Sequence, residues 1–142
     1  MKVIYFAEHF TTPKMGGAVR PYQMAERLIA HGHQVTMVCG GDHKMLDLLE
    51  TNRKNIYRGD VDGIDVIQIS LPYSNNDSVA KRAITFLKFA RKEMGIALRE
   101  DYDLLFATST PLTHGLPGIV AKWFRRKKFV FEVRDLWPEL PK

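Results

Sequence analysis

Charged side chains close an otherwise apolar segment near the carboxyl end of this chain, at Glu132, Arg134 and Asp135. In an open α/β sheet, ligands bind outside the carboxyl ends of the strands, so charges placed there are either solvated or directed at a ligand. Strand alternation puts Glu132 and Arg134 on one face, which leaves an ion pair between them as the simpler interpretation. We take Arg134 and Asp135 as candidate catalytic residues and Glu132 as a candidate substrate-binding residue.

Two adjacent glycines form a second candidate. Gly16 and Gly17 precede a helical pattern in which Pro21 fits only the first turn, so they lie where that helix begins. Residues without side chains let a ligand approach the backbone, and a helix N-terminus offers N–H groups to a phosphate or a sugar hydroxyl. A loop that needs glycine only for its turn geometry is the alternative. Gly16, Gly17 and Arg20 are therefore candidate substrate-binding residues.

A third candidate is the helix start at Ser109 and Thr110. Thr110 is a typical N-cap residue and Pro111 is typical of the first helical position. The amides of this helix start are expected to point toward the same sheet edge as the glycine pair. His114 follows one turn later. Simple capping, and a packed or solvated histidine, are the alternatives, and Ser109, Thr110 and His114 complete the candidate substrate-binding set.

Neither a dinucleotide cofactor nor a cysteine-bound metal is expected. The dinucleotide fingerprint needs G-x-G-x-x-G in the tight turn that leaves the first strand, whereas residues 8–15 intervene here before Gly16. Asp42, an acid after the second strand, keeps that rival interpretation open. Cys39 is the only cysteine, so a disulfide within the chain and a cysteine metal cluster are both impossible. Cys39 is expected to be a small buried residue that packs in the core.

The elements that must position these residues alternate along the chain. Apolar periodicity and turn residues predict them. The predicted strands span residues 2–7, 35–39, 55–58, 64–70, 103–108 and 128–133, and the predicted helices span residues 19–31, 45–49, 78–99 and 110–125. This alternation favours an α/β fold, a Rossmann-like, mostly parallel sheet with helices on both faces.

Three local features refine this prediction. The turn-rich residues 59–63 predict a hairpin or meander between two of the strands. The helix over residues 78–99 is amphipathic, with a basic face opposite an apolar one. The predicted apolar face consists of Val79, Ala83, Phe86, Leu87, Ala90, Met94, Ala97 and Leu98. Pro117 and Gly118 should kink or delay the helix over residues 110–125.

Length and composition fit one globular domain. The chain has 142 residues, of which 45% are hydrophobic and 26% charged. No apolar run approaches the roughly 18 residues that a membrane span needs. The chain begins directly as a strand, without the features of a signal peptide. We therefore expect a cytoplasmic protein.

The net charge of +5 favours anionic partners. Residues 122–128 form a basic run with two aromatic residues. Together with the basic face of the long helix, this run could hold the protein peripherally against anionic lipid at the inner face of the membrane. The preference of cations for helix C-termini is the simpler interpretation. Nucleic acid is not expected as a partner, because no recognisable binding module accompanies the charge.

Two motifs resemble one family of enzymes. The Gly-Gly-x-x-Arg pattern after the first strand, with the helix and residues 32–38 that follow, resembles the opening of family-four glycosyltransferases with the GT-B fold. Residues 132–139 are similar to the matching segment of the branch that builds bacterial surface polysaccharides such as lipopolysaccharide and capsule, including N-acetylfucosaminyl-type transferases. The resemblance covers the whole chain, but only the N-terminal domain of such enzymes.

The resemblance implies two Rossmann-like domains that face a cleft. Residues 1–142 would form the N-terminal half, which mainly holds a lipid-linked or polysaccharide acceptor. The nucleotide-diphosphate sugar donor would bind mainly to a C-terminal domain absent from this chain, and transfer would retain the anomeric configuration without a metal. Gly16 and Gly17 match the family's glycine loop near the donor phosphates and the acceptor, and Arg134 and Asp135 fall at a strand end that lines the cleft.

The charge that develops on a departing nucleoside diphosphate must be stabilised in a dry cleft, which half a cleft cannot supply. We therefore predict that residues 1–142 fold but transfer no sugar alone. Two alternatives stay open. One is a complete small nucleotide-binding or regulatory α/β module, which tight nucleotide binding by this chain would favour. The other is a non-enzymatic docking surface, which failure to bind anionic vesicles at low salt would exclude.

Overall fold

Within the residues that the structure describes, seven strands form one sheet in the order β3-β4-β5-β2-β1-β6-β7. The structure, a computed structural model, describes residues 1–17, 19–40, 48–49, 51–52, 54–71, 76–109 and 112–134. The strands are β1 (Lys2–Ala7), β2 (Gln34–Gly40), β3 (Thr51–Asn52), β4 (Ile56–Val61), β5 (Ile64–Ile69), β6 (Leu104–Thr108) and β7 (Lys128–Glu132). The helices are α1 (Arg20–Ala30), α3 (Val79–Arg99), the short 3-10 helix η1 (Leu112–His114) and α4 (Gly115–Arg125).

The sheet is parallel except at one side. β1 lies between β2 and β6, and β5 and β7 extend the parallel set outward. β4 pairs antiparallel with β5, and β3, which was not predicted, pairs antiparallel with β4. The winding reverses at β1, so β1 and β6 flank the topological switch point where such sheets bind ligands. The predicted Rossmann-like α/β fold is confirmed.

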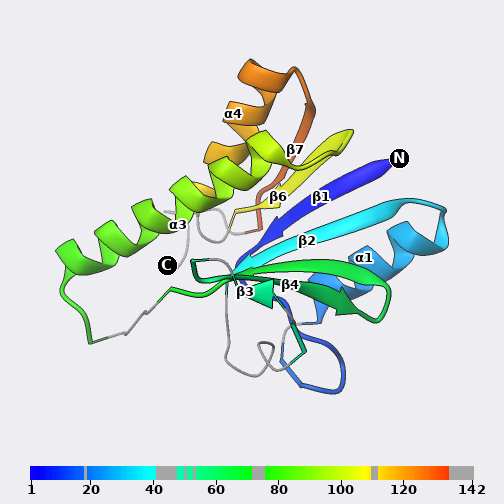
Figure 1. Cartoon of the computed structure of the whole chain (residues 1–142), viewed down its shortest axis with the longest axis horizontal. Coiled ribbons are helices and arrows are strands. Elements are labelled where there is room, and N and C mark those ends of the chain that lie inside the picture. The colour runs from blue at the N-terminus through cyan, green and yellow to red at the C-terminus, as the bar shows by residue number, and fades with distance from the viewer. Residues whose placement is uncertain are drawn as a thin grey trace, which may run out of the picture.

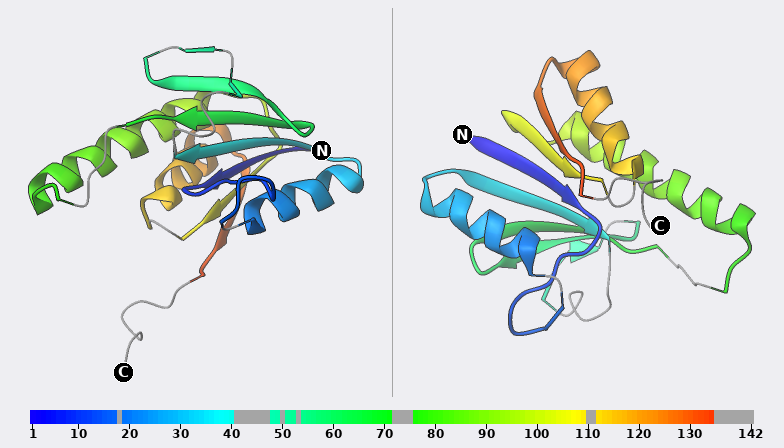
Figure 2. Two further views of the ribbon diagram at one scale, coloured as in Figure 1. Left: turned by 90° about the horizontal axis from the view of Figure 1, so that it is seen from below. Right: turned by 180° about the vertical axis from the view of Figure 1, so that it is seen from behind.

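Helices cover both faces of the sheet: α1 lies on one face, and α3 and α4 lie on the other (Figures 1 and 2). Successive side chains of β1 point to opposite faces and are buried on both, as expected for a central parallel strand. The core on the α1 side includes Tyr5, Ala7, Tyr22, Ala25 and Met37. The core on the other side includes Ile4, Phe6, Ile96, Ala97, Leu105 and Ala121.

The long helix α3 buries a different stripe from the predicted one. Its buried residues are Phe89, Ala90, Glu93, Ile96 and Ala97. Ala90 and Ala97 were predicted correctly, whereas Val79 and Leu87 are 82% and 64% exposed. The amino-terminal half of α3 extends beyond the sheet, so its apolar residues have no core to cover (Figure 1).

The predicted hairpin is confirmed, but its turn is tighter than expected. β4 continues through Gly59 to Val61, so the assignment of residues 59–63 to the turn is wrong. The turn consists of Asp62 and Gly63, which have φ values of 54° and 84°. Positive φ at both positions is what a two-residue type I′ turn requires, and Asp-Gly is its typical sequence.

The helix after β6 begins later than predicted, at Gly115. Pro117 therefore lies in the first turn, where its missing N–H needs no partner, so the expected delay is confirmed and no kink is needed. Gly118 allows α4 to approach β7 closely, because a Cβ at Gly118 would lie only 2.0 Å from the ring of Phe129. The predicted cap residues at positions 110–111, and residues 45–47 of the predicted short helix, lie outside the described residues.

Candidate functional site at the carboxyl edge of the sheet

The carboxyl ends of the parallel strands bring several candidate residues to one edge of the sheet. Glu8 follows β1, Ser109 follows β6 and Glu132 ends β7. We call this side of the sheet the carboxyl edge, and the opposite side, where the parallel strands begin, the amino edge. The carboxyl edge is where a parallel sheet of this topology is expected to hold its ligand.

The glycine pair lies in the loop between β1 and α1. Gly16 and Gly17 have φ values of 75° and 100°. Residues other than glycine rarely adopt such values, so the backbone conformation requires glycine at both positions. An ideal Cβ at Gly16 would meet nothing within 4 Å, so the loop is open on that side. The N-cap residue of α1, Val19, makes no side-chain cap hydrogen bond. An open loop beside an uncapped helix N-terminus is suited to an anion.

Arg20 and Glu132 form an ion pair between the start of α1 and the end of β7. The partner of Glu132 is therefore Arg20, where the sequence suggested Arg134. The Arg20 side chain remains 55% exposed while that of Glu132 is 20% exposed. The second oxygen of Glu132, Oε2, is buried and has no hydrogen-bond partner within the described part of the chain. The pair holds a partly exposed guanidinium beside the glycine loop.

Ser109 fixes the chain where it leaves β7. Its backbone N–H donates to the carbonyl of Glu132 at 2.9 Å. Its Oγ accepts a hydrogen bond from the backbone N–H of Arg134 at 2.8 Å. Ser109 itself is only 6% exposed, whereas Arg134 is exposed. Ser109 thus orients the segment that carries Arg134, while Thr110 and Asp135 lie outside the described residues.

His114 is buried between two carboxylates. Its Nε2 lies 3.3 Å from Oε2 of Glu8 and 3.3 Å from Oε1 of Glu93. These distances fit ion pairs, but the atoms are not aligned as hydrogen bonds. Among the residues that the structure describes, both ring nitrogens of His114 and both oxygens of Glu93 therefore have no hydrogen-bond partner. Phe89 stacks on the imidazole, with ring centroids 5.9 Å apart. Because His114 is completely buried, a ligand could touch its ring only after neighbouring side chains had moved.

Exposure differs sharply within this group of three. The side chains of His114 and Glu93 are 0% exposed, whereas that of Glu8 is 27% exposed. Burial first, and the charge of Glu8 second, raise the pKa of Glu93 well above its ordinary value. Burial and the charge of Glu8 also raise the pKa of the Cys39 thiol, which is 1% exposed and packed in the core as expected. Glu8 is thus the member of the group whose side chain is partly exposed to solvent.

Sequence reasoning missed both Glu8 and Glu93, although each left a signal. Glu93 follows the buried Phe89 and Ala90 at helical spacing and precedes Ala97 by four residues, so it is an acid within an apolar stripe. Glu8 is an acid placed directly after the first strand of a parallel sheet. Neither residue belongs to a motif, which is why their proximity to His114 emerged only from the fold.

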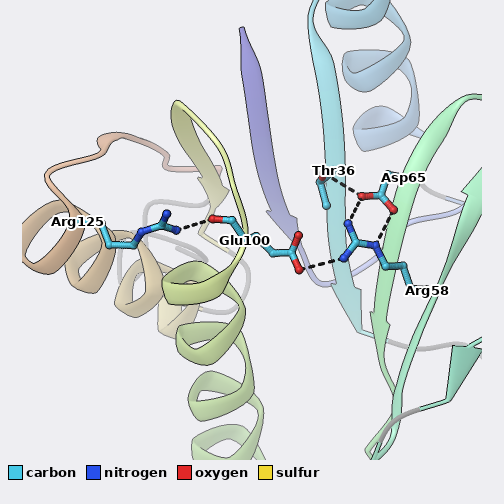
Figure 3. A network of polar contacts seen from close by, with 5 residues as sticks. All are labelled: Thr36, Arg58, Asp65, Glu100 and Arg125. Atoms are coloured by element: carbon cyan, nitrogen blue, oxygen red, sulfur yellow. Dashed lines mark hydrogen bonds and ion pairs between the residues drawn. The ribbon is translucent and has the colours of Figure 1, made fainter.

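The amino edge is built differently. Arg58 donates from Nε and Nη2 to the two oxygens of Asp65 at 3.0 and 2.7 Å, and from Nη1 to Oε1 of Glu100 at 3.0 Å. Thr36 adds a hydrogen bond to Asp65 at 3.0 Å. Figure 3 shows this network, in which Arg125 of α4 also reaches the backbone carbonyl of Glu100. The network joins the hairpin of β4 and β5 to the end of α3.

A polar hollow of about 270 Å³ lies beside this network and is also lined by Lys2 and Asp101. Lys2 pairs with Asp101, and Arg58 pairs with Asp65 and Glu100. The charged residues that line the hollow therefore satisfy one another. For this reason, and because it lies opposite the switch point, we assign the hollow a structural role.

Part of the basic run over residues 122–128 is also structural. Arg125 donates to the carbonyl of Ala97 at 3.1 Å, and its guanidinium lies 5.2 Å from the centroid of the Tyr102 ring. Lys127 lies 5.5 Å from the same centroid. Arg125 and Lys127 thus tie α4 to the end of α3, while the remaining basic residues, Lys122, Arg126 and Lys128, are exposed.

A family model described as "Glycosyl transferase 4-like domain" matches residues 15–142. The matched region begins just before the glycine pair and includes η1, α4 and β7. The chain belongs to this glycosyl transferase family. Glu8 precedes the matched residues of the glycosyl transferase 4-like domain. No curated protein matches the chain.

Solved structures resemble the domain in fold. The C-terminal domain of a hydrogenase from Pyrococcus furiosus has a TM-score of 0.62 at 17% identity, with 92% of this chain and 89% of that chain covered. A second crystal structure of that domain has a TM-score of 0.61 at 15% identity, with 92% and 90% covered. An E. coli structure titled "Trehalose-6-phosphate", bound with UDP-2-fluoro glucose, has a TM-score of 0.44 at 12% identity, with 92% of this chain and 32% of that chain covered. At 17% and 15% identity, the likeness to the two hydrogenase-domain structures concerns the fold alone.

Two further findings concern the described residues of the glycosyl transferase 4-like domain. Among their helices, none combines the length and the hydropathy that crossing a bilayer requires. Over the same residues, histidine, cysteine and acidic side chains do not gather in a group of three that could hold a metal ion.

Proposed function

We propose that this domain is the acceptor-side half of a retaining glycosyltransferase, which moves a sugar from a nucleotide-diphosphate sugar to a lipid-linked or polysaccharide acceptor. The family match over residues 15–142 carries the proposal. The placement of the glycine loop, Arg20 and the end of β7 at one edge of the sheet supports it. The donor would bind mainly to a second domain that faces this edge.

The glycine loop and Arg20 would bind the phosphates of the donor. The open side of Gly16 allows close approach of the backbone, and the uncapped start of α1 directs N–H groups and a positive dipole end outward. Arg20 adds a guanidinium that is 55% exposed. These groups would stabilise the negative charge that develops on the leaving diphosphate, without a metal.

Arg134 and Asp135 would act on the reacting groups. Arg134 is exposed beyond β7, and Ser109 holds its backbone. Substitution of Arg134 by alanine should lower kcat of the full-length enzyme by about 100-fold, the usual effect of removing one group that stabilises transition-state charge. Asp135→Ala should likewise reduce transfer far more than stability.

Lys128→Ala is the matched control for these two substitutions. Lys128 is exposed and begins β7 at the amino edge, at the opposite end of the strand from Glu132. Its removal changes the charge of the same strand without touching the carboxyl edge, so kcat should stay unchanged. Equal turnover by Arg134→Ala and Lys128→Ala would refute the role assigned to Arg134.

The surface-polysaccharide branch, including N-acetylfucosaminyl-type transfer, is the finer part of the proposal. It rests on the likeness of residues 132–139 to that branch. Transfer assays with the full-length protein and a panel of nucleotide sugars, using a polyprenyl-diphosphate-linked sugar as acceptor, would identify the donor. A product of any one donor would support glycosyl transfer, whereas hydrolysis or no reaction with the whole panel would count against it.

The isolated chain separates this proposal from its main alternative. As the acceptor-side half, residues 1–142 should fold, show no transfer and bind free nucleotides weakly. Calorimetric titration of the chain with UDP, GDP and ATP measures its affinity for free nucleotides directly. Tight binding of one nucleotide by this chain would favour the complete nucleotide-binding or regulatory module instead.

We further propose a cytoplasmic protein in peripheral contact with anionic membrane through the projecting half of α3. Ile84 and Leu87 are 52% and 64% exposed, and the exposed Lys88 and Arg91 follow at helical spacing on the same side. Such a surface combines apolar insertion with attraction to anionic headgroups. This placement would bring a lipid-linked acceptor near the carboxyl edge, where α3 begins.

Vesicle cosedimentation tests the membrane contact. The double variant Ile84→Ser/Leu87→Ser should lose binding to vesicles that contain anionic lipid, and high salt should weaken binding of the unmodified protein. Val130→Ser, which changes an exposed apolar residue on β7, is the matched control. Equal binding by all three proteins would exclude this surface.

A further inference from the structure

The buried group formed by Glu8, Glu93 and His114 has no part in the function proposed so far. Two of its members are completely buried, and Nε2 of His114 lies at the same distance, 3.3 Å, from a carboxylate oxygen of each acid. Ionisable groups buried without hydrogen bonds cost stability. A chain that keeps such groups together at its topological switch point therefore calls for an explanation beyond packing.

Glu8 is held from two sides. One carboxylate oxygen, Oε2, faces His114, while the other, Oε1, lies over the end of β2, where a Cβ on Gly40 would come within 2.8 Å of it. The backbone N–H of Gly40 donates to the carbonyl of Glu8 at 3.0 Å. Gly40 thus leaves the space that the Glu8 carboxylate occupies, and His114 sets the direction in which it points.

The charge of the group is the same in either arrangement of its proton. Glu93 can be protonated beside a neutral imidazole, or it can be ionised beside an imidazolium. The raised pKa of Glu93 favours the first arrangement. A carboxylate such as that of Glu8 can only accept hydrogen bonds.

An acceptor-only carboxylate at the open edge selects its ligand by charge. It repels phosphate, which the glycine loop and Arg20 attract. Hydroxyl groups, by contrast, donate to carboxylates in strong, short hydrogen bonds. The carboxyl edge therefore has a side suited to anions at the start of α1 and a side suited to neutral hydroxyl donors at Glu8.

We propose that Glu8 binds a hydroxyl group of a neutral sugar at the carboxyl edge, and that His114 and Glu93 are positioning residues that hold its carboxylate. In naming a sugar, the proposal rests on the proposed glycosyltransferase function. It goes beyond the family assignment, because Glu8 lies outside the residues that match the family.

The contact within the group can be tested without any ligand. The ring nitrogens of His114, followed by NMR in the isolated chain, should change chemical shift in Glu8→Gln and in Glu93→Gln. Glu26→Gln, which removes the same charge from an exposed position on α1, should leave His114 unchanged. Unchanged ring-nitrogen chemical shifts of His114 in Glu8→Gln would overturn the positioning role.

Sugar binding is tested with N-acetylglucosamine and methyl glucoside at millimolar concentration. The amide signals of Glu8 and Gly40 should shift, and Glu8→Gln should weaken binding by about tenfold, the usual effect of losing a hydrogen bond to a charged group. Gly40→Ala keeps the carboxylate but displaces it, so it should weaken binding. Because it retains Glu8, this variant also serves if Glu8→Gln does not fold.

Two results would overturn the proposal: no shift at Glu8 and Gly40 with either sugar, or equal binding by Glu8→Gln and the unmodified chain. Neither result bears on glycosyl transfer itself, which the full-length transfer assay decides. Conversely, sugar binding at Glu8 together with no transfer from any nucleotide sugar would support a carbohydrate-binding site at the carboxyl edge and would refute the proposed glycosyltransferase activity.

Discussion

At the amino edge, Arg58 donates hydrogen bonds to two carboxylates through three nitrogen atoms, and Thr36 donates a further hydrogen bond to Asp65. At the carboxyl edge, the imidazole of His114 faces two carboxylates without an aligned hydrogen bond. Both edges thus place one basic side chain between two acids. They differ in whether the polar atoms find partners.

The difference indicates what each edge contributes. Paired and partly exposed charges at the amino edge fasten the hairpin to α3 at little cost in desolvation. Buried and poorly aligned ionisable groups at the carboxyl edge cost stability, as groups at binding sites often do. The comparison therefore favours a structural role for the amino edge and a ligand-binding role for the carboxyl edge.

The largest effect is expected from α4, which joins the two edges by carrying His114 at its start and Arg125 in its last turn. Gly118→Ala would place a Cβ 2.0 Å from the Phe129 ring and should lower the free energy of unfolding by about 3 kcal/mol, because α4 must move away from β7. Denaturant unfolding measures the loss.

Gly115→Ala is the matched control for that substitution. A Cβ at Gly115 would lie 3.6 Å from Phe131, which is ordinary van der Waals contact, and alanine favours the helix. We expect a change within about 0.5 kcal/mol. Equal losses in the two variants would show that the close approach of α4 to β7 at Gly118 is not what matters.

The second effect concerns Glu93 and depends on pH. Its pKa is raised in the folded state, so the unfolded chain releases a proton that the folded chain retains once the pH exceeds the ordinary value of 4.5. This contribution makes stability fall as pH rises from there to the raised pKa. Glu93→Gln should remove this pH dependence. The stability of the variant relative to the unmodified protein should therefore rise with pH, by at most about 1.4 kcal/mol per pH unit.

Urea midpoints of both proteins over a pH series measure this difference. Glu26→Gln, at an exposed position, should follow the pH curve of the unmodified protein. Parallel curves for Glu93→Gln and the unmodified protein would mean that the pKa of Glu93 is not raised in the folded state.

A smaller loss is expected at the amino edge. Arg58→Ala removes the shared partner of Asp65 and Glu100, but its side chain is 44% exposed, so solvent screens the interaction and the loss should be about 1 kcal/mol. Arg58→Lys keeps the charge without the planar fork and should lose part of this stability. Transfer by the full-length enzyme should not change, and a large loss of activity would contradict a structural role.

The smallest effect is expected from Lys2→Met. Lys2 pairs with Asp101 at the surface, and this pair lowers the pKa of Asp101. Both side chains are well exposed, so thermal unfolding should show no measurable change in stability at physiological salt. A clear loss would mean that the hollow at the amino edge is more tightly organised than its exposure indicates.

Much of the fold could be predicted from the sequence, because periodicity and turn residues are local signals. The strands at residues 2–7 and 128–133 and the helix over residues 78–99 were placed within a few residues of β1, β7 and α3. The buried stripe of α3 was predicted only in part. Which face of a helix is buried depends on how far it extends beyond the sheet, and that is a property of the whole fold.

The candidate site divides in the same way. The glycine pair and Arg20 carry a local motif, and the structure places Arg20 beside Glu132. The association of Glu8, Glu93 and His114 could not be predicted, because the three lie on separate elements and only the strand order brings them together. Acids at unusual positions are the signal that such a prediction should weigh more heavily.

The central place of β1 also has a consequence for biosynthesis. β1 is made first, yet Val3 pairs with Leu104 of β6, so one side of the first strand stays without its neighbour until most of the chain has left the ribosome. β1, α1 and β2 can associate early, whereas Glu8 meets His114 only when α4 arrives. The carboxyl edge is therefore completed only after β6, η1 and β7 have been made, and any early ligand or chaperone would encounter Glu8 as a solvated acid.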